Sequence, residues 1–228
     1  MNPGTLYAIA SPLGGPAAEA LPVAALSIVR SLRHFAVENE KTARAFLKDL
    51  AMPCAIQDLE IALLDGERAM KTLKEGHSLG LLSEAGCPAI ADPGAAIAEA
   101  AHREKIRVVP LVGPSSIVLA LMASGLEGQR FAFRGYLPRD AAGRKRGIRE
   151  LEARSRRERE TQIFIETPYR NDALLAALVE TAAANTLLCL ATELTLPGEN
   201  IRTESIGQWR KREHVIGKAP TVFLLLAS

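Results

Sequence analysis

Short apolar runs that end in loops rich in glycine and proline dominate the first half of the chain. The runs span residues 5–10, 79–82 and 106–112, and the loops that follow them span residues 11–16, 83–94 and 113–116. Segments with helical spacing lie between the runs, at residues 23–32, 42–50, 67–74 and 95–104. Alternating strands and helices are typical of βαβ units, whose parallel strands are buried on both faces. We therefore expect the three loops to meet at one edge of a sheet, where α/β proteins bind ligands.

The second half of the chain continues the α/β pattern. Apolar or alternating runs predict strands at residues 130–137, 161–167, 187–194, 201–206 and 221–226, and a helix over 172–183. In the first half, residues 34–37 predict one more strand. Residues 221–226 are too apolar for an exposed edge strand. The pattern predicts two α/β domains, 1–126 and 127–228, each with a largely parallel or mixed sheet flanked by helices. A cleft between two such domains is the default place for a ligand.

Composition excludes several function classes. The 228 residues are 48% hydrophobic, which suffices for a core, and the net charge of +2 favours neither nucleic acid nor membrane. Cys54, Cys87 and Cys189 never form a CxxC pair, and the four histidines are scattered, so the sequence predicts no metal site. The chain carries no apolar run of membrane-spanning length and no signal peptide. We therefore predict a cytoplasmic protein.

Seven short motifs, in order along nearly the whole chain, carry a family resemblance. They are SPLG at 11–14, VENEK at 37–41, SEAGCPAIADPG at 83–94, VVPLVGPS at 108–115, FRGYLP at 133–138, IETPYR at 165–170 and ATELTL at 191–196. With these motifs the chain resembles the tetrapyrrole methylase superfamily of S-adenosylmethionine-dependent methyltransferases. It is most similar to the branch that methylates a ribose 2′-hydroxyl of small-subunit ribosomal RNA. It departs from that branch at Asn39, Glu84, Cys87, Tyr169 and Leu196.

The resemblance implies S-adenosylmethionine as the cofactor, ribosomal RNA as the methyl acceptor and a homodimer as the assembly. Two other functions remain open: methylation of a tetrapyrrole or another small acidic molecule, and cofactor binding by a degenerate regulatory protein. The positions of the motifs imply a set of cofactor-binding residues in both halves of the chain. They are Pro12, Leu13, Gly14, Ser83, Glu84, Ala85, Cys87, Pro88, Ser115, Ser116, Phe164, Ile165, Ala191, Thr192, Pro220 and Thr221.

A ribose hydroxyl is a poor acid, so its methylation calls for a general base or a charged neighbour. Among the carboxylates at loops and strand ends, Glu166 is our first candidate for this catalytic role and Glu38 the second. Each carboxylate has the simpler alternative of a cap or an ion-pair partner. Lys41, Arg44 and Arg170 are candidates for orienting the acceptor through charge-assisted hydrogen bonds.

Residues 139–159 form the most basic stretch, with nine basic and four acidic side chains. They predict either a solvated helix face with ion pairs between successive turns, such as Glu150 with Arg154, or a surface that binds phosphates. No aromatic residue lies among the arginines, so the stretch gives no sign of base stacking. The apolar helix expected at residues 117–124 is a candidate dimer interface or simply part of the core.

Overall fold

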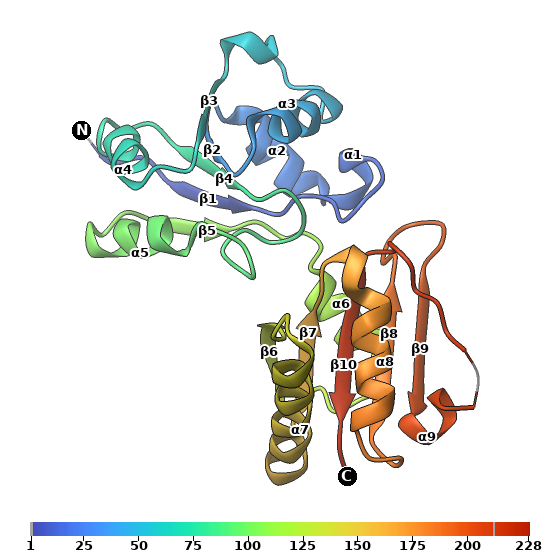
Figure 1. Cartoon of the computed structure of the whole chain (residues 1–228). Coiled ribbons are helices and arrows are strands. Elements are labelled where there is room, and N and C mark those ends of the chain that lie inside the picture. The colour runs from blue at the N-terminus through green and yellow to red at the C-terminus, as the bar shows by residue number, and fades with distance from the viewer. Residues whose placement is uncertain (1, 212) are drawn as a thin grey trace. The chain divides into compact units, whose positions relative to one another are not determined.

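The computed structural model describes residues 2–211 and 213–228, which form two compact units. Unit 1 ends at Ser115 and unit 2 begins at Ser116. Each unit contains one five-stranded sheet with helices packed against it (Figure 1). This arrangement confirms the predicted α/β fold class. No helix among the described residues is long and apolar enough to cross a bilayer.

All strands of the unit 1 sheet run parallel, in the order β3-β2-β4-β1-β5. The strands are β1 (Leu6–Ile9), β2 (His34–Val37), β3 (Glu60–Leu63), β4 (Leu79–Leu82) and β5 (Val108–Pro110). The helices are α1 (Ala17–Ala20), α2 (Val23–Ser31), α3 (Glu40–Asp49), α4 (Gly66–Lys74) and α5 (Ala95–Arg103), with a 3₁₀ turn η1 (Ile56–Asp58). The predicted strands and helices of this half are present, and α1, η1 and β3 are additional.

Both faces of the unit 1 sheet are covered, as an all-parallel sheet requires. Phe35 and Val37 of β2 pack into one cluster with side chains of α1, α2 and α3. Ala36, the residue between them, packs into a second cluster with side chains of α4 and α5. This alternation follows from the two-residue period of a strand. All four residues of the central strand β4 are buried, which explains its uninterrupted apolar sequence.

The unit 2 sheet is mixed, with the order β6-β7-β10-β8-β9. Its strands are β6 (Phe131–Tyr136), β7 (Thr161–Ile165), β8 (Leu187–Thr192), β9 (Asn200–Ser205) and β10 (Thr221–Leu226). Only β6 and β7 pair in parallel, whereas β10 runs antiparallel to both β7 and β8. The helices are α6 (Ser116–Ser124), α7 (Ala141–Glu158), α8 (Asn171–Thr181) and α9 (Ile206–Trp209), with a 3₁₀ turn η2 (Pro168–Arg170). The central position of β10 explains why its sequence is too apolar for an edge.

The division between the units differs from the predicted boundary at residues 126 and 127. Helix α6 belongs to unit 2, because it packs against β8, β9 and β10. A hydrogen bond of 2.6 Å from Thr203 Oγ1 to the carbonyl oxygen of Ser124 fixes the end of this helix to β9. Chain order suggested that α6 completes the first half, but such long-range packing leaves no local signal in the sequence.

Candidate functional site

The carboxyl ends of β2, β4, β1 and β5 lie side by side at one edge of the unit 1 sheet. The loop after β1 and the loop after β4 are joined there by a pair of backbone hydrogen bonds between Ser11 and Gly86, of 2.8 and 3.0 Å. Ser11 Oγ also donates to the carbonyl oxygen of Ser83 at 2.7 Å. Gly86 has a φ of +73°, a conformation that favours glycine. The prediction that these loops meet is confirmed.

The loop after β5 is held against the other two by close packing. A Cβ atom at Gly113 would lie only 2.5 Å from Ala10 Cβ, so this position requires glycine. The Cys87 thiol donates to the carbonyl oxygen of Pro114 at 3.4 Å. Burial raises the pKa of this thiol, which keeps it protonated at neutral pH. Cys87 therefore connects two loops and is a poor nucleophile.

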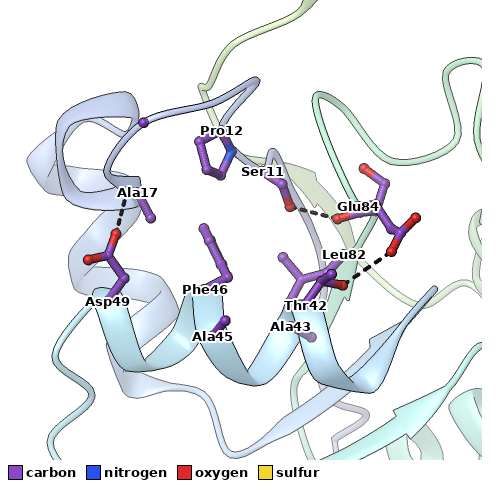
Figure 2. A pocket seen from close by; sticks show the side chains of 12 residues that line it. Ser11, Pro12, Ala17, Thr42, Ala43, Ala45, Phe46, Asp49, Leu82 and Glu84 are labelled. Atoms are coloured by element: carbon purple, nitrogen blue, oxygen red, sulfur yellow. Dashed lines mark hydrogen bonds between the residues drawn. The ribbon is translucent and has the colours of Figure 1, made fainter. Parts of the chain in front are cut away.

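A pocket of about 310 Å³ opens beside these loops in unit 1 (Figure 2). Of the residues predicted to bind the cofactor, Pro12, Ser83 and Glu84 line it. Leu13, Gly14, Ala85, Cys87 and Pro88 belong to the same loops but not to its lining. The pocket is also lined by residues outside the predicted cofactor-binding set. They are Ser11, Gly15, Ala17, Thr42, Ala43, Ala45, Phe46, Asp49 and Leu82.

Helix α3 forms one wall of this pocket. Thr42, Phe46 and Asp49 recur at helical spacing on α3. In Figure 2 Phe46 points toward Pro12 in the loop after β1, Thr42 toward Glu84 and Asp49 toward Ala17. The Asn39 side chain caps the helix by accepting hydrogen bonds from the backbone of Lys41 and Thr42. The Asp49 carboxylate accepts a hydrogen bond of 2.5 Å from the backbone of Ala17. In the sequence, the amphipathic pattern of residues 42–50 predicted this helix, but it did not indicate that the helix lines a pocket.

Carboxylates gather where β2 and β4 end. The backbone N–H of Glu84 donates to Glu38 Oε2 at 3.2 Å, and Thr42 Oγ1 lies 3.5 Å from Glu84 Oε1. Burial and then the charge of Glu38 raise the pKa of Asp92, with a smaller contribution from Glu84, against a hydrogen bond from Ser83. These side chains make this edge electronegative. No group of described residues has the geometry to hold a metal ion.

The corresponding strand ends of unit 2 carry the other candidate base. Glu166 follows β7, and its side chain is only 1% exposed. Its Oε1 accepts hydrogen bonds from the Thr167 backbone at 2.6 Å and from Arg170 Nε at 3.0 Å, and Arg170 Nη2 forms an ion pair with it. Its Oε2 is buried and has no hydrogen-bond partner among the described residues. Glu166 and Glu38 thus lie in different units.

Strand pairing gathers most of the remaining predicted residues at this edge of unit 2. Thr221 faces Thr192, and Val222 lies between Ala191 and Ile165. The hydroxyl groups of Thr192 and Thr221 donate to the carbonyl oxygens of Asn200 and Ala219, at 3.0 and 2.8 Å. The carbonyl of Pro220 accepts from the Glu193 backbone at 2.9 Å.

Two predicted residues at this edge are fully buried, and two others lie where the units divide. Phe164 and Ala191 are fully buried, with 0% of either residue exposed. Ser116 lies at the start of α6, directly after Ser115 at the end of unit 1.

Comparison with known proteins decides the family. The profile described as tetrapyrrole (corrin/porphyrin) methylases matches residues 5–209. The chain belongs to this family. It is a methyltransferase, and methyltransferases of this family generally use S-adenosylmethionine.

Curated relatives carry the name ribosomal RNA small subunit methyltransferase I. The protein from Pseudomonas aeruginosa is 32% identical over 89% of this chain and 71% of its own length. The protein from Escherichia coli O157:H7 is 30% identical over 97% of this chain and 77% of its own length. The chain therefore resembles this branch of the methylase family, as its motifs indicate.

Solved structures of two methyltransferases share the fold. The crystal structure of the methyltransferase CobJ matches with a TM-score of 0.65 and 16% identity, over 99% of this chain and 95% of that chain. Uroporphyrin-III-C-methyltransferase from Thermus thermophilus matches with a TM-score of 0.57 and 20% identity, over 98% and 92% of the two chains.

The basic stretch of this methyltransferase includes helix α7, and eight of its nine cations divide into two groups. The ninth, Arg144, donates from Nη2 to the carbonyl oxygen of Arg139 at 2.8 Å. Ion pairs join Lys145 to Glu180, Arg154 to Glu160, Arg156 to Glu152 and Arg157 to Glu158. The expected pair of Arg154 with Glu150 is replaced by the pair with Glu160, at 3.6 Å. The second group forms no ion pair with any described residue and is exposed. Its members are Arg139, Arg146, Arg149 and Arg159.

Proposed function

We propose that this methyltransferase transfers a methyl group from S-adenosylmethionine to a ribose 2′-hydroxyl of small-subunit ribosomal RNA. The observation that carries the proposal is the similarity to relatives named for methylating this RNA, which extends over most of both chains. The exposed arginines of α7 that lack acidic partners support an acceptor that carries phosphates. A cytoplasmic location, as the sequence predicts, fits this function.

The unit 1 edge suits the cofactor. Its pocket of about 310 Å³ falls within the range of small-molecule sites, and its lining mixes apolar side chains with the oxygens of Ser11, Thr42 and Glu84. When bound, S-adenosylmethionine supplies a methyl group on a positively charged sulfur. The carboxylates of Glu38, Glu84 and Asp92 favour a cation at this edge by charge attraction. We propose that the loops holding Pro12, Gly14 and Ser83 bind this cofactor.

The acceptor hydroxyl loses a proton when its oxygen takes the methyl group, so a nearby acceptor of that proton assists the reaction. Glu166 remains our first candidate, because its buried Oε2 has no hydrogen-bond partner among the described residues. Arg170 occupies Oε1 and fixes the orientation of the carboxylate. Glu38 remains the second candidate, because it directly follows β2 at the edge where the pocket lies; its Oε2 accepts a hydrogen bond from the backbone of Glu84.

A tetrapyrrole is the second candidate for the acceptor. The fold shared with uroporphyrin-III-C-methyltransferase favours it, although similarity at 20% identity supports the fold alone. The two acceptors differ in a measurable way, because an RNA extends beyond a pocket and is expected to contact the cations of α7, whereas a tetrapyrrole is small enough to be bound within a pocket. A degenerate regulatory protein would bind the cofactor and transfer no methyl group to either acceptor.

The first experiment is calorimetric titration with S-adenosylhomocysteine of the wild type and of Gly14→Arg. We expect saturable binding by the wild type and none by the variant, in which a long cationic side chain occupies the loop after β1. Gly66→Arg is the matched control, because a side chain at Gly66 meets open space and lies outside the pocket lining. No binding by the wild type at millimolar ligand would exclude the proposed cofactor.

The second experiment offers labelled S-adenosylmethionine with small-subunit ribosomal RNA that lacks its ribose methylations. We expect label in the RNA, and we expect Glu166→Gln to lower kcat more than KM. Label transferred only to a tetrapyrrole offered in its place would favour the second candidate. Binding of S-adenosylhomocysteine without any transfer would favour the regulatory protein.

We also propose that the protein is a homodimer, the assembly that the family resemblance implies. Met122 on α6 is 75% exposed, which is unusual for a large apolar side chain and marks this helix as the surface to test. Sedimentation of the wild type and of the Met122→Glu variant measures the oligomeric state and so tests this prediction. We expect the charged variant to shift the protein toward the monomer.

A further inference from the structure

Tyr169 presents an aromatic ring to solvent on a well-held turn of unit 2. The residue is 81% exposed and lies in η2, directly after the strand β7 and Glu166. The turn is fixed by a backbone hydrogen bond of 2.9 Å from Arg170 to Thr167 and by the ion pair of Arg170 with the buried Glu166. The ring is therefore carried by a defined backbone, although nothing in the core holds it.

A cation lies over this ring. Lys218 Nζ is 5.0 Å from the centroid of Tyr169, within the range of a cation–π contact. The segment of Lys218 is tied to the first turn of α8: Asp172 Oδ1 accepts from the backbone of Ile216 at 2.7 Å and of Gly217 at 3.2 Å. Asn171 Nδ2 donates to the carbonyl oxygen of Ala219 at 2.8 Å. Since η2 leads directly into α8, one short stretch of chain holds both the ring and the lysine.

More positive charge lies at the same edge of the sheet. Strands β6 and β7 are parallel, so the turn after β6, which holds Arg139, reaches this edge together with η2. Arg139 is exposed and forms no ion pair with any described residue. The neighbouring carboxylates are already engaged, Glu166 with Arg170 and Asp172 with backbone N–H groups. The edge therefore combines an exposed ring with cations that are available to a ligand.

We propose that Tyr169 stacks on an unpaired base of the RNA substrate, while Lys218 and Arg139 contact the adjoining phosphates. The inference rests on the proposed RNA substrate. Proteins that read single-stranded RNA place unstacked bases on aromatic side chains and track the backbone with cations. Because the backbone segments that carry the ring and the lysine are fixed before binding, little backbone ordering remains to oppose the contact. The family motif has a histidine at this position, so the larger ring is a feature of this chain.

The test measures binding of a fluorescein-labelled single-stranded RNA of mixed sequence, 20 nucleotides long, and of the matching duplex. We expect the wild type to prefer the single strand. Tyr169→Ala and Tyr169→Leu should weaken its binding by about tenfold, since loss of one stacked base costs roughly five- to a hundredfold. Tyr169→Phe should bind as the wild type does, because it retains the ring. All four proteins should bind S-adenosylhomocysteine equally.

Lysine variants supply the matched comparison. Lys218→Ala should weaken binding several-fold and reduce the salt dependence by about the contribution of one phosphate contact. Lys211→Ala should change neither quantity, because Lys211 follows α9, at the opposite end of the sheet. If Tyr169→Ala binds the single strand as tightly as the wild type, stacking is wrong and the proposed function stands. If the wild type binds neither RNA while it binds S-adenosylhomocysteine, the RNA substrate and the stacking fail together.

Discussion

The two sheets present their functional groups differently at the edges where their special loops lie. In unit 1, four parallel strands end together, and a pocket and three carboxylates lie at their ends. In unit 2, the sheet is mixed, and its edge carries an exposed ring with Lys218 and Arg139. A pocket beside carboxylates suits a compact cation, whereas an open surface of ring and cations suits an extended polyanion. Under the two proposals above, one α/β architecture would serve two kinds of ligand through the residues at its strand ends.

The largest expected effect comes from Arg170→Ala, which tests whether the unit 2 edge depends on its buried ion pair. The change leaves the Glu166 carboxylate, with 1% of its side chain exposed, without its charged partner. We expect a loss of about 3 kcal/mol in the free energy of unfolding, measured by urea denaturation. Lys145→Ala, which breaks the more exposed pair with Glu180, is the control and should cost less than about 1 kcal/mol. Equal losses in both variants would show that burial does not distinguish the two pairs.

The next effect tests the close packing of the unit 1 edge. Gly113→Ala brings a Cβ to 2.5 Å from Ala10 Cβ and 2.9 Å from the Leu21 side chain, so the loops after β1 and β5 must separate. We expect a loss of roughly 1–3 kcal/mol in unfolding free energy and weaker binding of S-adenosylhomocysteine. Gly66→Ala meets open space and should cost nothing. A Gly113→Ala protein with wild-type stability would mean that this edge is loosely packed.

A smaller effect tests the difference in charge between the carboxylates of unit 1 and the cations of unit 2. We expect the double variant Arg146→Ala with Arg149→Ala to bind RNA several-fold more weakly and to lower the slope of log affinity against log salt by about 1 to 2. Its affinity for S-adenosylhomocysteine should not change. The control removes Arg154 and Arg157, which are already paired with Glu160 and Glu158. If both double variants lose the same RNA affinity, net charge alone explains the binding.

The smallest effect concerns the carboxylates of unit 1. Because the pKa of Asp92 is raised, the folded protein binds this proton more tightly than the unfolded chain, and ionised Asp92 lowers stability at neutral pH. We expect Asp92→Asn to stabilise the protein at pH 7 by less than about 1 kcal/mol, since the group is partly solvated. The gain should vanish below about pH 4, where the wild-type carboxyl is protonated as well. Thermal unfolding across this pH range measures the effect, and Asp58→Asn, at an exposed position outside the cluster, is the control substitution.

Much of the fold was predictable because its signals are local. The apolar runs at residues 79–82 and 221–226 predicted buried strands, and the helical spacing at residues 23–32 and 95–104 predicted helices close to the observed bounds. Residues 51–65 carry no clear period, and they form the short turn η1 and the strand β3. Strand β3 lies at the edge of its sheet, with only Ile61 buried, which explains the weak pattern.

The candidate site was predictable only in part. The motifs located the loops of Pro12, Ser83 and Glu84 that line the pocket, but Phe46 and Asp49 were read as part of a helix without a ligand role. The basic stretch was located, but which of its arginines form ion pairs depends on acids elsewhere in the chain, such as Glu180. No aromatic residue lies among these arginines, and Tyr169, which lies outside that stretch, carried no sign of an RNA contact in the sequence.

The sequence by itself determined the α/β class, the family, and the loops at which chemistry is expected, because periodicity and short motifs are properties of neighbouring residues. Only the tertiary structure decided that α6 belongs to unit 2, that Arg170 neutralises Glu166, and that Lys218 lies over Tyr169. The last contact depends on hydrogen bonds from the segment around Gly217 to Asp172, more than forty residues earlier. Such pairings arise when a core and its strand order bring distant segments together, and no local pattern in the chain records them.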